Sequence, residues 1–173
     1  MNRINRILLA LCTGLSITAA ALPAAYRPSI RIVYNPSASA PLGWYRVQAT
    51  ASPRVGDYVL ATLPPDAAAL AAQRGYLPAG LPILKRIGAV SGQQVCWHED
   101  VLAVDGTALG YVLRNDPQGR PLPARRQCRR LVQGELFLFS ATHRASFDSR
   151  YFGPIVLSAV QGQAIPLWTW SAL

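Results

Sequence analysis

The sequence has few side chains that bind metals and few acidic residues. It contains three cysteines and two histidines, His98 and His143, and none of them has the spacing of paired metal ligands, which excludes a zinc-finger type of site. Aspartate and glutamate number 8 against 17 lysines and arginines, so the net charge is +9. Lys85 is the only lysine, and the positive charge is therefore almost wholly that of arginine. Such a charge suits anionic lipid headgroups or nucleic acid, and composition alone does not distinguish them.

Charged residues are also missing near the amino terminus, between Arg6 and Arg27. A helix over residues 7–25 would be about 28 Å long, close to the hydrocarbon thickness of a bilayer. We interpret residues 1–26 as an export signal that remains as a single membrane-spanning helix. Residues 27–173 would then form a domain on the periplasmic side of a bacterial inner membrane. A cleaved signal peptide is the alternative, since the small residues at 21–25 suit a cleavage site.

Cys96 and Cys128 are the only cysteines in the expected domain, because Cys12 falls within the apolar amino-terminal run. In an oxidising compartment this pair could form a disulfide, which the chain-entropy model values at about 3 to 4 kcal/mol. Two separate buried thiols are the alternative.

Short strands dominate the expected domain. One helix is predicted at residues 64–76, because Pro65 suits a first helical turn and Gly75 an end. Residues 114–130 are polar and basic, which is typical of an exposed loop. Alternating and β-branched segments predict strands at 29–35, 43–49, 57–63, 81–90, 93–98, 135–141, 153–160 and 163–168, and a hairpin at 101–113 that turns at Asp105-Gly106. The fold class is mostly β, a small barrel or sandwich with one short helix.

Lys85 is the first candidate for chemistry. In the segment LPILKRIGAV, strand alternation places it on the same face as Ile83 and Ile87. Burial on that face would lower the pKa of the amine and make it a base, whereas an arginine could not act as one. A solvent-facing lysine beside Arg86 in an edge strand is the alternative.

Two further stretches contain candidate residues. NPSASAPLGWYRV, residues 35–47, places Ser37 and Ser39 two positions apart, which by itself is typical of a surface turn. THRASFDSRYFGPI, residues 142–155, has alternating polar residues that would share one face of an extended segment: Ser146, Asp148 and Arg150. The last two could form an ion pair, although this stretch by itself is typical of a polar hairpin end.

Together the three stretches resemble the type I signal peptidase family. Its members have a serine followed closely by proline, a lysine in an apolar strand followed by arginine, and a closing S-x-D-S-R-Y-x-G segment. The resemblance is closest to the conjugative-transfer branch, the TraF peptidases, whose serine box N-x-[ST]-x-S-x-P-x-G-x-Y is filled here from Asn35 to Tyr45. The chain departs from the family at residues 91–93, which read S-G-Q instead of P-G-D. It also lacks the G-D-N-R element that general signal peptidases have before the position of Ser146.

The resemblance implies a signal-peptidase-like fold and a serine endopeptidase that needs no metal or other cofactor. Ser39 would be the nucleophile and Lys85 the general base, with the Ser39 amide and the Ser37 hydroxyl as the oxyanion hole. Supporting roles, which orient the lysine amine and hold the segment around it, would fall to Ser146, Asp148 and Arg150.

The implied partners are exported precursor proteins with small residues before the cut. The conjugative pilin precursor of a mating (type IV secretion) system is the first candidate, released as a linear chain or joined into a ring. Membrane lipid is also expected, and Trp168 with Trp170 could either contact the membrane interface or simply pack. Nucleic acid is not expected, because no basic-aromatic arrangement of a known module is visible. Two alternatives stay open: a general type I signal peptidase for secretory preproteins, and a non-catalytic basic module that binds DNA or scaffolds the transfer apparatus.

Overall fold

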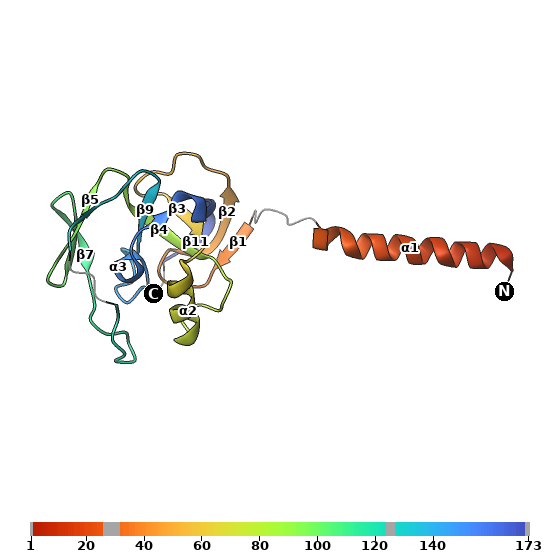
Figure 1. The fold of residues 1–173 in the computed structure, drawn as a ribbon, viewed down its shortest axis with the longest axis horizontal. Helices are drawn as coiled ribbons and strands as arrows, with labels where there is room; N and C mark the ends of the chain where they lie inside the picture. Colours follow the sequence, from red (N-terminus) through yellow and green to blue (C-terminus); the bar gives the residue numbers. More distant parts are fainter. Residues whose placement is uncertain (1, 26–31, 124–126, 172–173) are drawn as a thin grey trace. The chain divides into compact units, whose positions relative to one another are not determined.

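The computed structural model describes residues 2–25, 32–123 and 127–171, apart from the side chains of residues 6 and 20–25. The chain divides into two units, residues 1–30 and residues 31–173 (Figure 1). The domain boundary predicted between residues 26 and 27 lies outside the described residues.

The first unit is a single helix, α1 (Arg3–Ala25). Its hydroxyl groups are satisfied locally, since Thr13, Ser16 and Thr18 each donate to the carbonyl four residues earlier. Within the described residues, no helix is both long and apolar enough to cross a membrane. The predicted membrane span is therefore not supported by the described residues.

The second unit is built on a seven-stranded antiparallel sheet with the order β1-β2-β11-β3-β4-β9-β10. The strands are β1 (Ile32–Asn35), β2 (Leu42–Gln48), β3 (Tyr58–Ala61), β4 (Ile83–Val90), β9 (Glu135–Phe139), β10 (Ile155–Val156) and β11 (Val160–Trp170). The long strand β11 pairs with both β2 and β3 and has irregular register on each side, which helps the sheet to curl into a half barrel (Figure 1). The prediction of a mostly β domain is thus confirmed.

A second sheet has the order β7-β6-β5-β8. Its strands are β5 (Gln94–His98), β6 (Val101–Val104), β7 (Thr107–Tyr111) and β8 (Arg129–Arg130). The turn between β6 and β7 is formed by Asp105 and Gly106, with φ angles of 48° and 82°, as in the hairpin turn that the sequence predicts. A disulfide joins Cys96 in β5 to Cys128 just before β8, and Cys12 is the free cysteine.

The helix α2 (Pro65–Gln73) forms inside the predicted window, with Pro65 in its first turn. The prediction of one short helix is wrong, because the second unit also contains α3 (Ser149–Phe152) and a 3-10 helix, η1 (Leu157–Ala159). An extended segment was expected at the start of α3. Asp148 prevents this, because its carboxylate accepts a hydrogen bond from the Arg150 amide and caps a helical turn.

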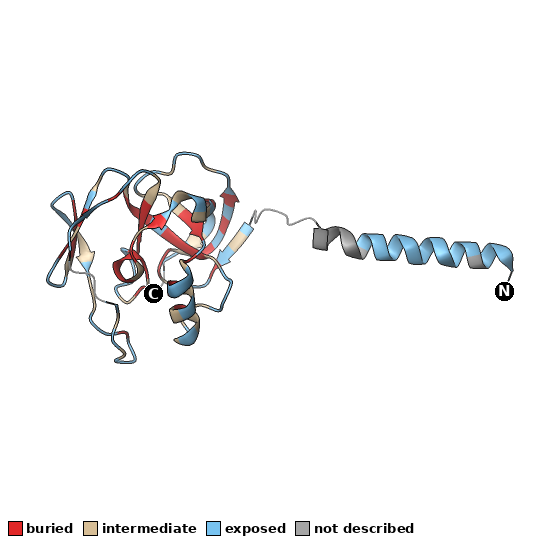
Figure 2. Cartoon of the chain, in the orientation of Figure 1, coloured by how far each residue is buried: buried red, intermediate tan, exposed pale blue. Residues whose placement is uncertain are grey.

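The core lies mainly in the larger sheet, where Figure 2 shows the buried residues concentrated. One apolar cluster packs α2 against the middle strands and includes Val59, Ala61, Ala67, Ile83, Ile87 and Leu138. Another joins the two sheets through Trp97 and Phe137, whose rings meet edge to face with centroids 5.9 Å apart. Strand β4 contributes to both clusters, with Ile83 and Ile87 in the first and Ala89 in the second.

Candidate active site

A cleft of about 640 Å³ opens on the larger sheet. It is lined by the loop after β1, by α2 and the segment that follows it, by strand β4 and by the loop before α3. They bring together four of the residues predicted for chemistry, namely Ser37, Ser39, Lys85 and Ser146. Much of the remaining wall is apolar and includes Leu63, Ala71, Leu77, Leu84 and Phe147.

The loop that contains both serines, residues 35–41, is held by the side chain of Asn35. Its Nδ2 group donates to the carbonyls of Ser37, at 2.9 Å, and Pro41, at 3.0 Å, while its Oδ1 accepts from the Ser37 amide at 3.2 Å. The two serine hydroxyl oxygens lie 2.7 Å apart, and Ser39 is only 8% exposed. These hydroxyls are therefore fixed beside the cleft, unlike those of an ordinary surface turn.

Two later residues of the serine box have structural roles. Gly43 has a φ of 129° and lies so close to β11 that a Cβ would clash with the carbonyl oxygen of Trp168. The hydroxyl of Tyr45 donates to the Pro41 carbonyl at 2.7 Å. Both interactions fix the point at which the serine loop enters β2.

Lys85 lies in the middle of β4, opposite Val59 of β3. Its side chain is 6% exposed, and its neighbours at alternate positions, Ile83 and Ile87, belong to the apolar cluster under α2. The alternative of a solvent-facing lysine is therefore wrong. The amine Nζ donates to the hydroxyl of Ser146 at 2.6 Å.

Burial lowers the pKa of the Lys85 amine from 10.5 to about 8, because the ammonium loses hydration. The charge of Asp148 opposes this shift and the charge of Arg150 reinforces it, but both effects are smaller than that of burial. Roughly a tenth of the amine is consequently neutral at pH 7, and this fraction can accept a proton.

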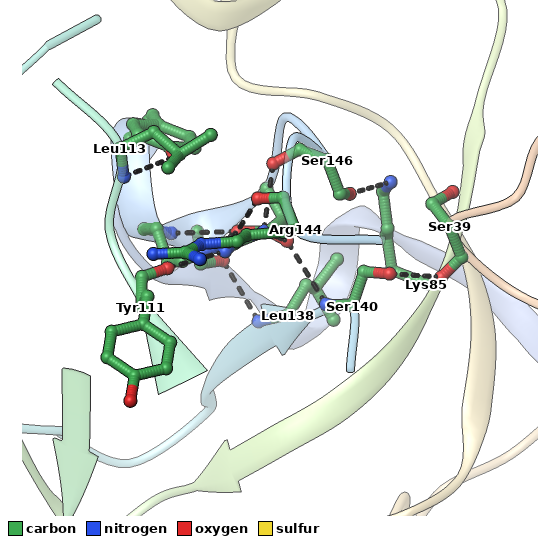
Figure 3. A network of polar contacts seen from close by, with 12 residues as sticks. Ser39, Lys85, Tyr111, Leu113, Leu138, Ser140, Arg144 and Ser146 are labelled. Atoms are coloured by element: carbon green, nitrogen blue, oxygen red, sulfur yellow. Dashed lines mark hydrogen bonds and ion pairs between the residues drawn. The ribbon is translucent and has the colours of Figure 1, made fainter. Parts of the chain in front are cut away.

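No hydrogen bond joins Ser39 to Lys85 among the residues that the structure describes. The Ser39 hydroxyl is bonded to Ser37. The Lys85 amine is bonded to Ser146, as Figure 3 shows. Both side chains nevertheless line the same cleft.

The predicted ion pair between Asp148 and Arg150 is present and fully buried. It is bidentate, with Nε to Oδ1 and Nη2 to Oδ2 distances of 2.8 Å. The guanidinium also donates to three backbone carbonyls, those of Tyr111, Arg144 and Ser146, at 2.7, 3.1 and 3.0 Å. Arg150 therefore holds the loop that carries Ser146 and links it to β7.

Sequence reasoning missed Ser140, which connects this ion pair to the serine loop. Its amide donates to Oδ2 of Asp148 at 3.1 Å, and its hydroxyl donates to the carbonyl of Ser39 at 2.7 Å (Figure 3). Thr142 makes a parallel contact, from its hydroxyl to the Ala38 carbonyl at 2.8 Å. The only sequence signal was a pair of hydroxyl residues directly after the apolar strand β9.

Exposed aromatic side chains lie beside the cleft, on β1, β2 and β11. Tyr34, which lines the cleft, has its ring centroid 5.1 Å from that of Trp44 and 6.4 Å from that of Trp170. Trp168 is 74% exposed and touches Trp170. The two carboxy-terminal tryptophans therefore pack against each other at the surface, and their contact with a membrane interface stays a prediction.

The second sheet contains a cluster of possible metal ligands that their sequence spacing did not suggest. The ligand atoms of Cys96, His98 and Cys128 lie within 4.8 Å of one another. The two sulfur atoms are bonded to each other as a disulfide, and a disulfide does not supply the thiolates that bind metals.

Comparisons with known proteins extend over nearly the whole chain. The family model described as "Signal peptidase, peptidase S26" matches residues 2–170. A plasmid transfer protein TraF from Escherichia coli is 30% identical over an alignment of 181 positions, which covers 98% of this chain and 100% of that protein. A second one from the same species is 35% identical over an alignment of 182 positions, which covers 96% of this chain and 99% of that protein.

A probable conjugal transfer protein TraF from Sinorhizobium fredii is 33% identical over an alignment of 178 positions, which covers 95% of this chain and 90% of that protein. Among solved structures, a signal peptidase I from Enterococcus faecalis matches with a TM-score of 0.40 and 19% identity, over 66% of this chain and 98% of that one. The family match and the near full-length relatives confirm the resemblance found in the sequence, and the chain therefore belongs to the signal peptidase S26 family, in its TraF branch.

Proposed function

We propose that the protein is a serine endopeptidase in which Ser39 is the nucleophile and Lys85 the general base. The observation that carries this proposal is the buried amine of Lys85, whose pKa is lowered to about 8 and which lines one cleft with Ser39. The neutral amine would take the proton of the Ser39 hydroxyl as Oγ attacks a peptide carbonyl carbon. It would then give that proton to the leaving amine, and water would hydrolyse the resulting ester.

The remaining groups would support these steps. The Ser39 amide and the Ser37 hydroxyl would donate to the developing oxyanion, and Ser146 would hold the lysine amine in place. The Ser39 hydroxyl must exchange its bond to Ser37 for one to Lys85. Catalytic hydrogen bonds are often long or absent until the substrate binds, so the geometry without substrate is compatible with this exchange.

The proposed substrate is an exported precursor protein with small residues before the cut, most directly a conjugative pilin precursor. The relatives named as plasmid or conjugal transfer proteins support this assignment. The apolar lining of the cleft suits small apolar side chains of an extended peptide. The product would be a linear pilin if water ends the reaction, or a cyclic one if the pilin's own amino group does.

The proposed place of action is the outer side of the inner membrane, where the domain would also meet membrane lipid. The disulfide between Cys96 and Cys128 supports an oxidising compartment. The apolar residues of α1 support export.

Intact mass spectrometry of a pilin precursor after incubation with the full-length protein tests the proposed function. We expect a single cut after a small residue, and the mass of the product shows whether a further water has been lost by ring closure. The Ser39→Ala variant serves as the control, and ordinary secretory precursors should stay uncut. An unchanged pilin precursor would contradict the pilin assignment, whereas efficient cleavage of the secretory precursors would favour a general signal peptidase.

The rate should depend on pH through Lys85. Because only the neutral amine accepts a proton, kcat/KM is expected to rise with pH up to the pKa of about 8 and then to level off. Initial rates with one peptide substrate between about pH 6 and 10 measure this profile. A rate that does not change over this range, in protein that stays folded, would contradict a lysine base.

A further inference from the structure

The basic loop 114–122 contains a buried carboxylate that the proposed mechanism does not use. The loop was expected to be exposed, yet Asp116 is only 7% exposed. Its Oδ1 accepts from the amides of Gln118, at 3.0 Å, and Arg120, at 2.8 Å, and its Oδ2 pairs with Nε of Arg120 at 2.6 Å. Burial raises the pKa of Asp116, but hydrogen bonds from Tyr76 and Arg120 outweigh that effect and lower the pKa to about 2. The carboxylate is therefore ionised at neutral pH.

Asp116 holds Tyr76, which follows the end of α2. The Tyr76 hydroxyl donates to Oδ2 of Asp116 across 40 residues of sequence. The guanidinium of Arg120 lies 5.4 Å from the centre of the Tyr76 ring and donates to the carbonyl of Arg74 at 3.3 Å. We call this group of Arg74, Tyr76, Asp116 and Arg120 the clamp, because it fastens the loop to the end of α2.

Tyr76 is also part of the cleft wall. Its ring centroid lies 5.3 Å from that of Phe147, which is the residue after Ser146 and also lines the cleft. The Phe147 ring in turn stacks on Tyr151 at 6.0 Å and meets Phe152 at 5.5 Å. Tyr76 thus lines the cleft together with Phe147, while its hydroxyl is bonded to Asp116, which does not line the cleft.

We propose that Tyr76 determines which substrate side chains the cleft accepts and that Asp116 is its positioning residue. This inference rests on the proposed peptidase function and names the part of the chain that would set its preference for small side chains. A charged hydrogen bond fixes the ring more firmly than packing alone, and a fixed ring cannot move aside for a larger side chain. Without the bond to Asp116, the ring can tilt away and the cleft can widen.

The test compares two peptides that differ at one position, the residue before the cut, which is alanine in one peptide and leucine in the other. Tyr76→Phe keeps the ring and removes its bond to Asp116, and Asp116→Ala removes the acceptor. We expect the ratio of kcat/KM for the alanine and leucine peptides to fall by about tenfold in both variants, mainly through a lower KM for leucine. The kcat for the alanine peptide should stay within about twofold of its original value, which a general structural defect would not allow.

Asp100→Asn is the matched control. Asp100 pairs with Arg114 at 3.3 Å, at the start of the same loop, but both side chains are exposed and neither lines the cleft. This variant should keep the original ratio. A Tyr76→Phe protein that melts like the parent and also keeps the original ratio would overturn the proposal, even if Asp116→Ala does not fold.

A binding measurement distinguishes a failure of this inference from a failure of the proposed function. Fluorescence anisotropy of the two labelled peptides can be measured on Ser39→Ala protein with and without Tyr76→Phe. If the parent protein cuts neither peptide, the peptidase proposal fails. The ratio of the Kd values for the leucine and alanine peptides still tests the role of the clamp. If Tyr76→Phe strengthens binding of the leucine peptide relative to the alanine peptide, the result supports the clamp. An unchanged ratio, or no binding of either peptide, overturns it.

Discussion

Ser39→Ala is expected to lower the rate of cleavage on the order of 10⁴- to 10⁶-fold, because the proposed covalent step then has no nucleophile. Lys85→Met should cause a loss of similar size, since its side chain has nearly the shape of lysine but no base. The two residues act as one unit in the proposed mechanism. The double variant should therefore be no slower than either single variant.

The free energy of unfolding supplies the control for Lys85→Met. Burial lowers the pKa of Lys85 from 10.5 to about 8, so between these values the unfolded chain binds a proton that the folded protein does not. The folded protein consequently loses stability as the pH falls from about 10.5 to 8, and the full penalty is present at pH 7. Lys85→Met removes this penalty and should raise the free energy of unfolding at pH 7 by up to about 3 kcal/mol.

Single-turnover cleavage measures the loss of rate, and urea unfolding of the same samples measures the change in the free energy of unfolding. Ser37→Ala provides a graded comparison, because loss of one oxyanion donor typically costs about 3 to 4 kcal/mol of transition-state stabilisation and leaves measurable activity. A folded Ser39→Ala or Lys85→Met protein with near-normal activity would refute the Ser39–Lys85 assignment.

Asp148→Ala is expected to lower the free energy of unfolding by about 3 to 5 kcal/mol, because it leaves the charge of Arg150 buried without a partner. Asp148 and Arg150 are 0% and 1% exposed, so water cannot hydrate the guanidinium in place of the lost carboxylate. The same change removes the acceptor of the Ser140 amide, and Ser140 holds the carbonyl of Ser39. Stability and activity should therefore decline together.

Urea denaturation measures the change in stability, and two further variants show its cause. The double variant Asp148→Ala with Arg150→Met should be more stable than Asp148→Ala alone, because it has no unpaired buried charge. Asp100→Asn breaks an exposed ion pair and should cost less than about 1 kcal/mol. If Asp148→Ala cost no more than Asp100→Asn, the buried ion pair would not be a major source of stability.

The sequence predicted the local features of the site well, because each depends on a short pattern. Alternation along β4 placed Lys85 on the face of Ile83 and Ile87, and the structure buries it there. The spacing of Asp148 and Arg150 predicted their ion pair. Both inferences needed only the pleat of a strand or the reach of neighbouring side chains.

Contacts between distant residues could not be predicted in this way. Ser140 and Ser39 are 101 residues apart, and no periodic pattern relates them. Asp116 stands in a stretch with the composition of an exposed loop, and only the fold reveals that Tyr76 and Arg120 satisfy its buried carboxylate. The short helix α3 was missed because a capping carboxylate overrode an alternating pattern.

The disulfide between Cys96 and Cys128 closes a segment of the chain that includes the whole loop 114–122. A crosslink across this segment removes many conformations from its opened state, so transient opening of the second sheet becomes rarer. The serine loop and Lys85 lie outside the closed segment, whereas Asp116 lies inside it. Thiol oxidation therefore restricts the segment that carries Asp116 more directly than the segments that carry the reacting groups.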